Sequence, residues 1–484
     1  MATEKKVLFN AFAQFFGKIL SIGASLIIVK ILTNIGKDFY GKYLTAYEFL
    51  AFFGILADAG LFAIAVREIS KYSNQKKIST SKKSPEFILG NIFSIRIFLI
   101  IIVTFLAGIS AQFISSYDSD IKLGIWITAI SMALTIVAGT LSSVLQARMK
   151  IHFFSAGLVL GKIILAILIF LIAQNKNIFE NNLFFMMLCA GVISNIIFCA
   201  FVIFFTKKEI RISLRFNFDW WKKIFKISLP YGLALILQTL YLRIDVILIS
   251  IILGASAVGT YGVATRIMES FLILGVFFGQ AILPKISAEE KKEKKASQTL
   301  SWGVEKLLIF SIPIIICVLV FSPKIILVLS SNEFLSTSNF LGSDSILKIL
   351  VPTVFFAYLN QLFTFSLVSK NRQNYLLIVN GIAVFINILL NVLFLKKFGI
   401  IVAAVSTIFC EIIVFGLLLY EIIKYFSLNF VFQNLIIIFT ANFLLWAIVY
   451  FASFYDYFIL AGGAGAIAYL SIFLYFKKKF LAVQ

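Results

Sequence analysis

The sequence predicts an all-α polytopic membrane protein with about 14 transmembrane helices, arranged as two parallel six-helix repeats followed by two extra helices. Hydrophobic residues make up 61% of the 484 residues, and only 13% are charged. A soluble protein contains roughly 45–50% apolar residues, so this chain has too few polar residues to cover a soluble core. The apolar segments run for about 20 residues, the length at which a helix crosses a bilayer.

The expected helices are the apolar segments between short polar or basic loops, because only helices satisfy their own backbone hydrogen bonds in lipid at this length. These segments are residues 8–32, 39–66, 87–108, 123–146, 154–173, 183–205, 227–253, 259–283, 303–322, 345–368, 376–395, 401–420, 433–453 and 458–476.

Basic residues are distributed unevenly between the loops, and this orients the helices. With a cytoplasmic amino terminus, the cytoplasmic loops and tails carry 28 of the 43 lysines and arginines, and the outside loops carry at most six. The positive-inside rule therefore predicts a protein of the cytoplasmic (inner) membrane with both termini in the cytoplasm. Lys396 and Lys397 are the local exception. The net charge of +21 is explained by these loops, and no loop is long enough for a nucleic-acid-binding domain, so no nucleic-acid partner is expected.

An internal repeat is visible at a shift of about 220 residues. GKYLTA at 41–46 aligns with GTYGVA at 259–264, and QARMK at 146–150 aligns with VSKNR at 368–372. Six spans per copy is an even number, so both copies enter the membrane in the same orientation. Two such bundles that face each other would enclose a central cavity.

The repeat divides the chain into an N-lobe of residues 1–215, a C-lobe of residues 216–425 and an accessory helix pair in residues 426–484. Prolines within or beside the spans are candidate kink points for movement of the two lobes. They are Pro230, Pro284, Pro313 and Pro352.

Metal and nucleophile chemistry has little support in this sequence. The four cysteines lie inside apolar runs without ligand spacing, and His152 is the only histidine. A histidine-based metal site or a catalytic triad is thereby excluded. No cofactor is expected, apart from a proton or Na⁺ that could drive transport.

Charged and amide side chains inside the spans are the candidate functional residues, because charge in a bilayer is costly and faces other helices or water. The expected binding residues for an anionic, polar cargo are Lys18, Arg96, Lys162, Arg243, Asn387 and Asn391. The candidates for gating pairs or ion coupling are Asp58, Asp245, Glu269 and Glu411. Arginine and lysine suit phosphate, and amides suit sugars, whereas a cavity for cations would concentrate carboxylates.

The span 227–253 carries two polar stripes on roughly opposite sides. One stripe is Gln238, Tyr241 and Asp245, and the other is Thr239, Arg243 and Ser250. Arg243 and Asp245 lie about 200° apart around the helix and cannot pair with each other. Either each has a separate function, or each is held in an ion pair with a neighbouring helix. Arg266 and Glu269 are three residues apart, and the two can neutralise each other.

Three segments resemble the polysaccharide-transporter proteins of bacteria and archaea. LADAGLFAIAVREISK (56–71) resembles their D-x-GL…RE pattern, and residues 229–267 resemble their mid-chain R-x-D and VG-x-Y segment. FGIIVAAVSTIFCE (398–411) resembles a third segment, with Val402 where a glycine is common. These are the Wzx-type oligosaccharide flippases of the multidrug/oligosaccharidyl-lipid/polysaccharide (MOP) exporter superfamily.

This resemblance implies a V-shaped, MATE-like bundle that moves a polyprenyl-diphosphate-linked oligosaccharide between leaflets by alternating access. The implied partners are this lipid-linked glycan, membrane lipids and polysaccharide assembly proteins. The alternatives are a lipid II-type flippase and a MATE-like drug or cation antiporter. A membrane enzyme is not expected, because the longest outside segment, 323–344, has only Glu333 and Asp344 as acids.

Overall fold

The structure is a computed structural model that describes residues 2–58, 60–72, 84–179, 182–289, 293–338, 340–370, 372–428, 432–452 and 469. Within these ranges, the side chains of 2–9, 11, 230–231, 234–235, 238–239, 242, 284, 287–288, 293, 432–435 and 452 are not described.

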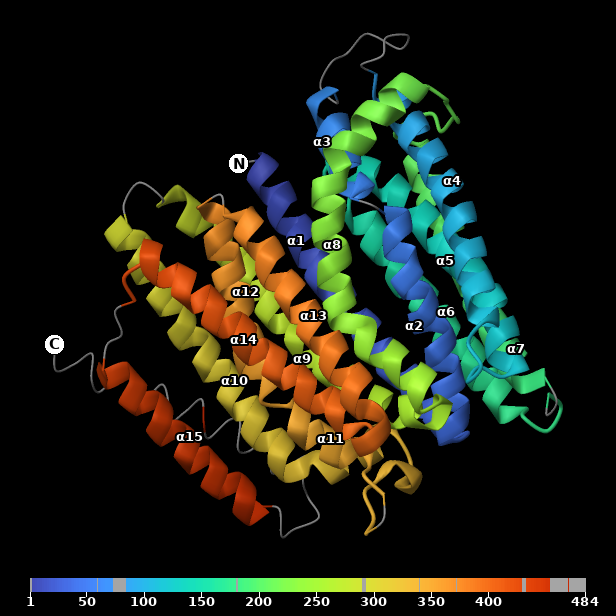
Figure 1. The fold of residues 1–484 in the computed structure, drawn as a ribbon. Helices are drawn as coiled ribbons and strands as arrows, with labels where there is room; N and C mark the ends of the chain where they lie inside the picture. Colours follow the sequence, from blue (N-terminus) through green and yellow to red (C-terminus); the bar gives the residue numbers. More distant parts are fainter. Residues whose placement is uncertain are drawn as a thin grey trace. The chain divides into compact units, whose positions relative to one another are not determined.

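Fifteen α-helices and one turn of 3₁₀ helix make up the described part of the chain (Figure 1). They are α1 (Ala2–Thr33), α2 (Lys37–Asp58), α3 (Leu61–Tyr72), α4 (Pro85–Gln112), α5 (Ser119–Ala147), α6 (His152–Gln174), α7 (Leu183–Lys207), α8 (Phe218–Ile252), α9 (Ala255–Ala288), α10 (Glu293–Leu329), the 3₁₀ turn Asn332–Phe334, α11 (Ser343–Leu350), α12 (Thr353–Ser369), α13 (Gln373–Phe398), α14 (Ile401–Tyr425) and α15 (Phe432–Ala452). The predicted all-α fold class is confirmed.

Ten segments of the described chain are long and apolar enough to cross a membrane, one of them formed by α2 and α3 together, and the bent pair α11–α12 makes an eleventh. These eleven correspond to predicted spans. The predicted span 227–253 lies within α8, and 433–453 matches the shorter apolar segment Ile436–Phe451 of α15. The predicted span 458–476 lies outside the described residues, apart from Tyr469.

The chain forms two compact units, Met1–Gly259 and Thr260–Gln484. Helix α8 packs against α2, α3 and α4 and so belongs to the first unit. The boundary between the units therefore falls later in the chain than the predicted lobe boundary at 215/216. The boundary of the sequence repeat itself stays a prediction.

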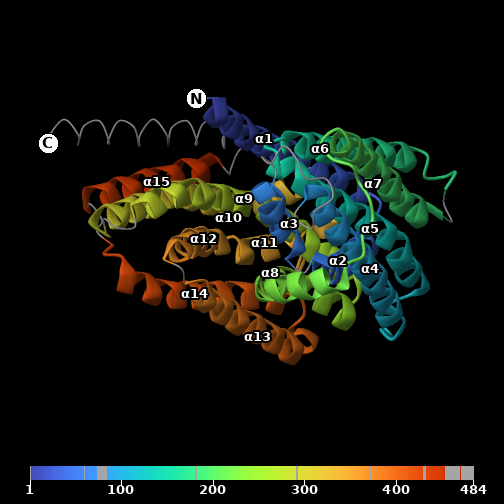
Figure 2. The same cartoon turned by 90° about the horizontal axis from the view of Figure 1, so that it is seen from above.

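Helix α5 is the centre of the first unit. It contacts α2, α3, α4 and α7, while α1 packs along α6 and α6 along α7 (Figures 1 and 2). Apolar side chains spaced three or four residues apart on α5 form this core, as a 3.6-residue period requires. Ala138, Leu141, Val144 and Leu145 are fully buried there.

The predicted span 39–66 is broken into two helices. Helix α2 ends at Asp58 and α3 begins at Leu61, with Gly60 at φ +74° between them. Glycine reaches this left-handed conformation without a steric cost from Cβ, so Gly60 permits the break. Asp58, the last residue of α2, is thereby placed at a helix end inside the bundle.

Helix α12 lies between α10 and α14 in the second unit, and α13 packs along α14 (Figure 2). Helices α11 and α12 meet at a bend of 41° beside Pro352, so one predicted kink point is confirmed. Helix α10, in contrast, runs continuously through Pro313. Helix α15 packs on α10 through Ile438, Ala441 and Leu445.

The repeat motif G-x-Y-x-x-A lies at a close helix crossing. A Cβ atom on Gly41 would collide with the carbonyl oxygen of Ala255, and one on Gly259 would collide with that of Lys37. Both equivalent glycines are therefore needed for the same reason. Without side chains, they let the first turns of α2 and α9 come into backbone contact.

The turn that follows the fourth span has the same form in both repeats. The amide of Lys150 donates to the Leu145 carbonyl at 2.7 Å, and the amide of Arg372 donates to the Leu367 carbonyl at 3.0 Å. These are the residues that the alignment of QARMK with VSKNR makes equivalent, so the two turns agree with the predicted repeat.

A glutamate at the end of the sixth span holds this turn in each repeat. In the first repeat, Glu209 accepts from Lys150 at 2.6 Å and from Arg148 at 3.3 Å. In the second, Glu421 pairs with Arg372 at 3.4 Å and with Lys424 at 3.0 Å. We call these two groups the glutamate clamps. Burial alone would raise the pKa of Glu209, but the pairs with Lys150 and Arg148 outweigh it and hold that pKa below its usual value.

Replacing Glu209 with glutamine is expected to lower the free energy of unfolding by about 1 kcal/mol at pH 7, because the ion pairs are lost. A carboxylate whose pKa is lower in the folded than in the unfolded protein stabilises the fold fully at a pH above the unfolded-state pKa. This stabilisation is lost as the pH falls through the folded-state pKa. The difference in the free energy of unfolding between wild type and Glu209→Gln should therefore shrink near pH 4. Thermal unfolding of the purified proteins at pH 7 and pH 4 measures this difference. An equal difference at both pH values would contradict a stabilising function of the Glu209 ion pairs.

Candidate functional site

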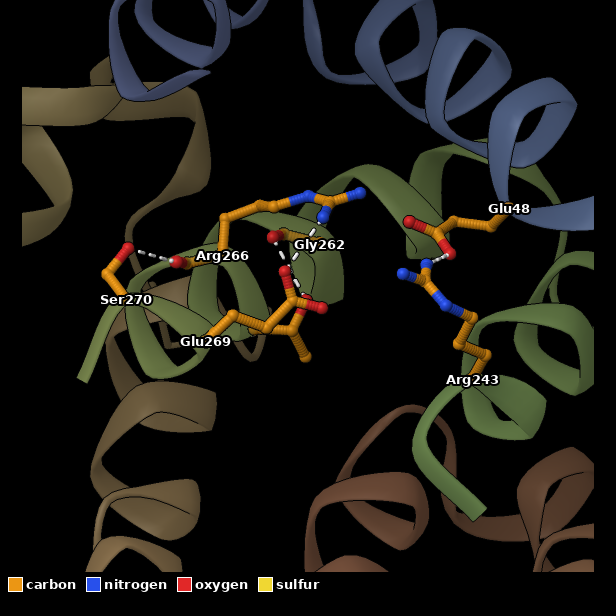
Figure 3. A network of polar contacts seen from close by, with 7 residues as sticks. Glu48, Arg243, Gly262, Arg266, Glu269 and Ser270 are labelled. Atoms are coloured by element: carbon orange, nitrogen blue, oxygen red, sulfur yellow. Dashed lines mark hydrogen bonds and ion pairs between the residues drawn. The ribbon is translucent and has the colours of Figure 1, made fainter. Parts of the chain in front are cut away.

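Two arginines inside the first unit, Arg243 and Arg96, are held in ion pairs between helices. Arg243 on α8 contacts Glu48 on α2, and Figure 3 shows the guanidinium and the carboxylate directed at each other. The Glu48 side chain is 7% exposed, whereas that of Arg243 is 32% exposed. The carboxylate is thus enclosed in protein, whereas the arginine side chain is partly accessible. A guanidinium has five N–H donors, more than a contact with one carboxylate oxygen uses.

Asp245 has different surroundings from Arg243. It is buried, although it lies only two residues further along α8. The separation of the two residues around the helix predicted this difference. The side chains of Gln238 and Thr239 lie outside the described residues, so the two predicted stripes are seen only in part.

Arg96 is in the most enclosed of these pairs. It extends from α4 to Asp58 at the end of α2, and it also donates to Thr140 Oγ1 on α5 at 2.9 Å. The side chain is 3% exposed. Three helices thus meet at a single guanidinium, which stabilises the break between α2 and α3. The diphosphate-binding function predicted for Arg96 has no accessible surface in this conformation.

Lys18 and Lys162 lie on neighbouring helices of the first unit. Helices α1 and α6 are in contact where Gly17 meets Ser155 and Val159, and each lysine is within one turn of that contact. Lys18 is exposed, and Lys162 is half-buried.

The second unit has one ion pair within α9. Arg266 Nη1 lies 2.8 Å from Glu269 Oε2, as their spacing predicted, and Ser270 Oγ donates to the Arg266 carbonyl at 2.9 Å (Figure 3). Both charged side chains are partly exposed.

Glu411 is buried on α14 and is bound by an amide. Asn360 Nδ2 on α12 donates to Glu411 Oε2 at 2.6 Å and to the Glu411 carbonyl at 3.1 Å. The carboxylate is therefore contacted by a neutral donor, in contrast to the arginine–carboxylate pairs of the first unit.

The predicted amides Asn387 and Asn391 are fully buried between α13 and α14. Asn391 Nδ2 donates to Asn387 Oδ1 at 3.1 Å and to Ser406 Oγ at 2.9 Å. This arrangement links two helices through hydrogen bonds, and it places the amides in a helix contact rather than on an exposed surface.

The structure thus brings Asp58 together with Arg96, and Arg266 together with Glu269. Glu48, the partner of Arg243, was missed by sequence reasoning, although a lone carboxylate within a span was a sufficient signal. In the described residues, no three or more His, Cys, Asp or Glu side chains gather in a way that could hold a metal ion. Whether the predicted site residues contact a cargo stays a prediction.

Comparison with known proteins relates this geometry to two protein families. Residues 4–290 match the family described as "Polysaccharide biosynthesis protein", and residues 230–393 match the MatE family. The second match begins in α8 and ends in α13.

Two curated relatives have names that refer to glycan export. The "Probable low-salt glycan biosynthesis flippase Agl15" of Haloferax volcanii is 27% identical over 34% of this chain and 34% of its own length. The chain thus spans about a third of that relative. The "Putative O-antigen transporter" of Shigella flexneri is 22% identical over 84% of this chain and 94% of its own length.

Among solved structures, the lipid II flippase MurJ in an inward closed conformation matches with a TM-score of 0.77. The match is 17% identical and covers 98% of both chains. This likeness establishes the fold, that of a bundle of membrane-spanning helices. The match to residues 4–290 covers more than half of the chain. It includes two of the three resembling segments, 56–71 and 229–267, whereas 398–411 lies outside it. The chain therefore belongs to the polysaccharide biosynthesis protein family.

Proposed function

We propose that this protein is a flippase that moves a polyprenyl-diphosphate-linked oligosaccharide across the cytoplasmic membrane. The observation that carries the proposal is Arg243, an arginine inside the helix bundle that is paired with Glu48 while its side chain stays 32% exposed. Arginine binds phosphate oxygens through its planar set of donors. The family membership and the names of the two relatives support the same cargo class.

In the proposed mechanism, the diphosphate and the glycan enter between the helices while the polyprenyl chain stays in lipid. The tail then never passes through water, and the head group is shielded from the bilayer core, where bare charge is very costly. Arg243 and Lys18 bind the diphosphate, with Lys162 beside Lys18 on α6. Both termini lie in the cytoplasm, as the basic loops predict, and assembly proteins of the polysaccharide receive the cargo.

The direct test is transfer of a fluorescent polyprenyl-diphosphate oligosaccharide in proteoliposomes. A membrane-impermeant quencher reports how much of the labelled lipid has changed leaflet. Protein-dependent transfer supports the proposal. If lipid-linked oligosaccharides of several compositions all remain in place, while an organic cation is exported by the same vesicles, the protein is an antiporter. Transfer of lipid II alone would instead indicate a peptidoglycan-precursor flippase.

The antiporter alternative is favoured by one observation, the buried Glu411 with its neutral partner Asn360. Carboxylates buried inside a membrane bundle are frequent sites of proton or Na⁺ binding. We propose that Glu411 has this coupling function in the flippase as well.

Replacing Glu411 with glutamine is expected to remove the dependence of transport on an ion gradient, because the amide can neither release a proton nor carry charge. The measurement compares initial transfer rates with and without a pH or Na⁺ gradient. Glu333→Gln, which removes an exposed carboxylate of the same unit that is not among the predicted coupling residues, is the control. A gradient response that persists in Glu411→Gln would exclude Glu411 as the coupling residue.

A further inference from the structure

A basic and aromatic surface lies on the segment that joins α7 to α8 in the first unit. We call it the linker surface and define it by six exposed residues. They are Arg211, Phe216, Phe218, Lys222, Lys223 and Lys226. Phe216 is 64% exposed and Phe218 is 73% exposed. Neither the proposed cargo binding nor the coupling function uses these residues.

The backbone under the linker surface is held tightly to α4. Asn91 Oδ1 accepts from the amide of Asn217 at 2.9 Å and from Trp221 Nε1 at 3.0 Å. The amide of Arg215 donates to the Gly90 carbonyl at 3.3 Å and to Ser94 Oγ at 3.2 Å. These bonds account for the exposure of the two phenylalanines, because they hold the segment in one position against the helix.

The first turns of α8 bury one face and expose an apolar flank beside a basic flank. Ile224 and Ser228 are buried against the first unit. On the outer side, Phe218 and Phe225 are seven residues apart and share one flank, and the lysines at 222, 223 and 226 lie next to it. An apolar flank that adjoins a basic flank is the pattern of a helix that lies in a membrane interface.

We propose that the linker surface lies in the head-group layer of the bilayer and binds anionic phospholipids. The two phenylalanines reach the acyl boundary, where burying their rings is favourable. The lysines and Arg211 bind the phosphates of the leaflet, because basic side chains are attracted to an anionic membrane surface. The surface is continuous with α4 and α7, which are long and apolar enough to span the membrane. The membrane–water interface is therefore the partner that contacts the apolar flank and the basic flank at the same time.

The test uses tryptophan fluorescence in nanodiscs. The variant Trp126→Phe, Trp302→Phe, Trp446→Phe retains Trp220 and Trp221 beneath the linker surface. Quenching by dibrominated phosphatidylglycerol in a phosphatidylcholine disc is compared with quenching by dibrominated phosphatidylcholine at the same fraction. We expect stronger quenching by the anionic lipid. Lys222→Gln, Lys223→Gln, Lys226→Gln is expected to lower the preference by about tenfold, as the loss of several surface charges predicts.

The matched control removes three other exposed lysines, in Lys176→Gln, Lys396→Gln, Lys397→Gln, and should leave the preference unchanged. Phe216→Ser, Phe218→Ser should weaken quenching by both lipids. Equal quenching by the two lipids in the reference protein would overturn the proposal, as would a preference that survives loss of the lysines. If neither lipid quenches Trp220 and Trp221, and their fluorescence changes only when an assembly protein is added, the partner of the linker surface is a protein. None of these measurements uses the transported lipid, so they are independent of the flippase assay.

Discussion

Replacing Arg243 with alanine is expected to lower the initial rate of head-group transfer at least about tenfold, because a charge-assisted hydrogen bond is worth about 1.5–3 kcal/mol. Arg243→Lys should restore transfer only in part, since a lysine keeps the charge but loses the planar donor set. Lys18→Ala should have a smaller effect in the same direction, because Lys18 is more exposed. The measurement is transfer of the labelled lipid in proteoliposomes.

The control for this prediction is Arg67→Ala, which removes an exposed arginine of α3 whose ion-pair partner is the adjacent Glu68. Its transfer rate should equal that of wild type. Glu48→Gln separates the two functions of the pair, since it leaves the arginine in place. If Arg243→Ala and Glu48→Gln are equally destabilised while both still transfer lipid normally, Arg243 only holds α2 and α8 together. The predicted binding site would then be wrong.

Replacing Arg96 with leucine is expected to lower the free energy of unfolding by about 3 kcal/mol, because breaking a buried ion pair leaves an uncompensated charge. Asp58 would remain at the end of α2, and Thr140 would lose its donor. The double variant Arg96→Leu, Asp58→Leu should recover much of the loss, since a buried pair replaced by apolar residues is often neutral. Chemical unfolding of the purified protein measures both values.

Arg67→Leu is the comparison for this series, and its effect should stay within about 0.5 kcal/mol. A different outcome is equally informative. If Arg96→Leu keeps the stability of wild type but no longer transfers the labelled lipid, Arg96 binds the head group in a second conformation. The stabilising function inferred from its burial would then be incorrect.

The positions of the helices could be predicted from the sequence, because the thickness of a bilayer sets the length of a spanning helix. Eleven predicted spans match helices that can cross a membrane, and the repeat alignment matches the turns at Lys150 and Arg372. The break at Gly60 was missed, since hydropathy continues across residues 56–66 without interruption. The hydropathy of an apolar segment does not reveal whether one of its glycines has a positive φ.

The candidate site was only partly predictable. Spacing along one helix is enough to pair Arg266 with Glu269, because residues three apart are neighbours on a helix surface. It cannot pair Arg243 with Glu48 or Arg96 with Asp58, which come from different helices. Composition predicted a basic surplus, and the structure shows that each of these two arginines is bound by a carboxylate. Contacts between helices depend on packing, which a single sequence does not reveal.

The glutamate clamps form the same kind of brace in the two halves of the predicted repeat. Both copies kept the brace at the end of the fourth span, with Glu209 in one and Glu421 in the other. The buried polar contacts differ in kind from these braces. Arg96 and Asp58 form an ion pair in the first unit, and Asn360 donates to Glu411 in the second. Exchanging the two turns between the copies should be tolerated, whereas exchanging the buried polar groups should not.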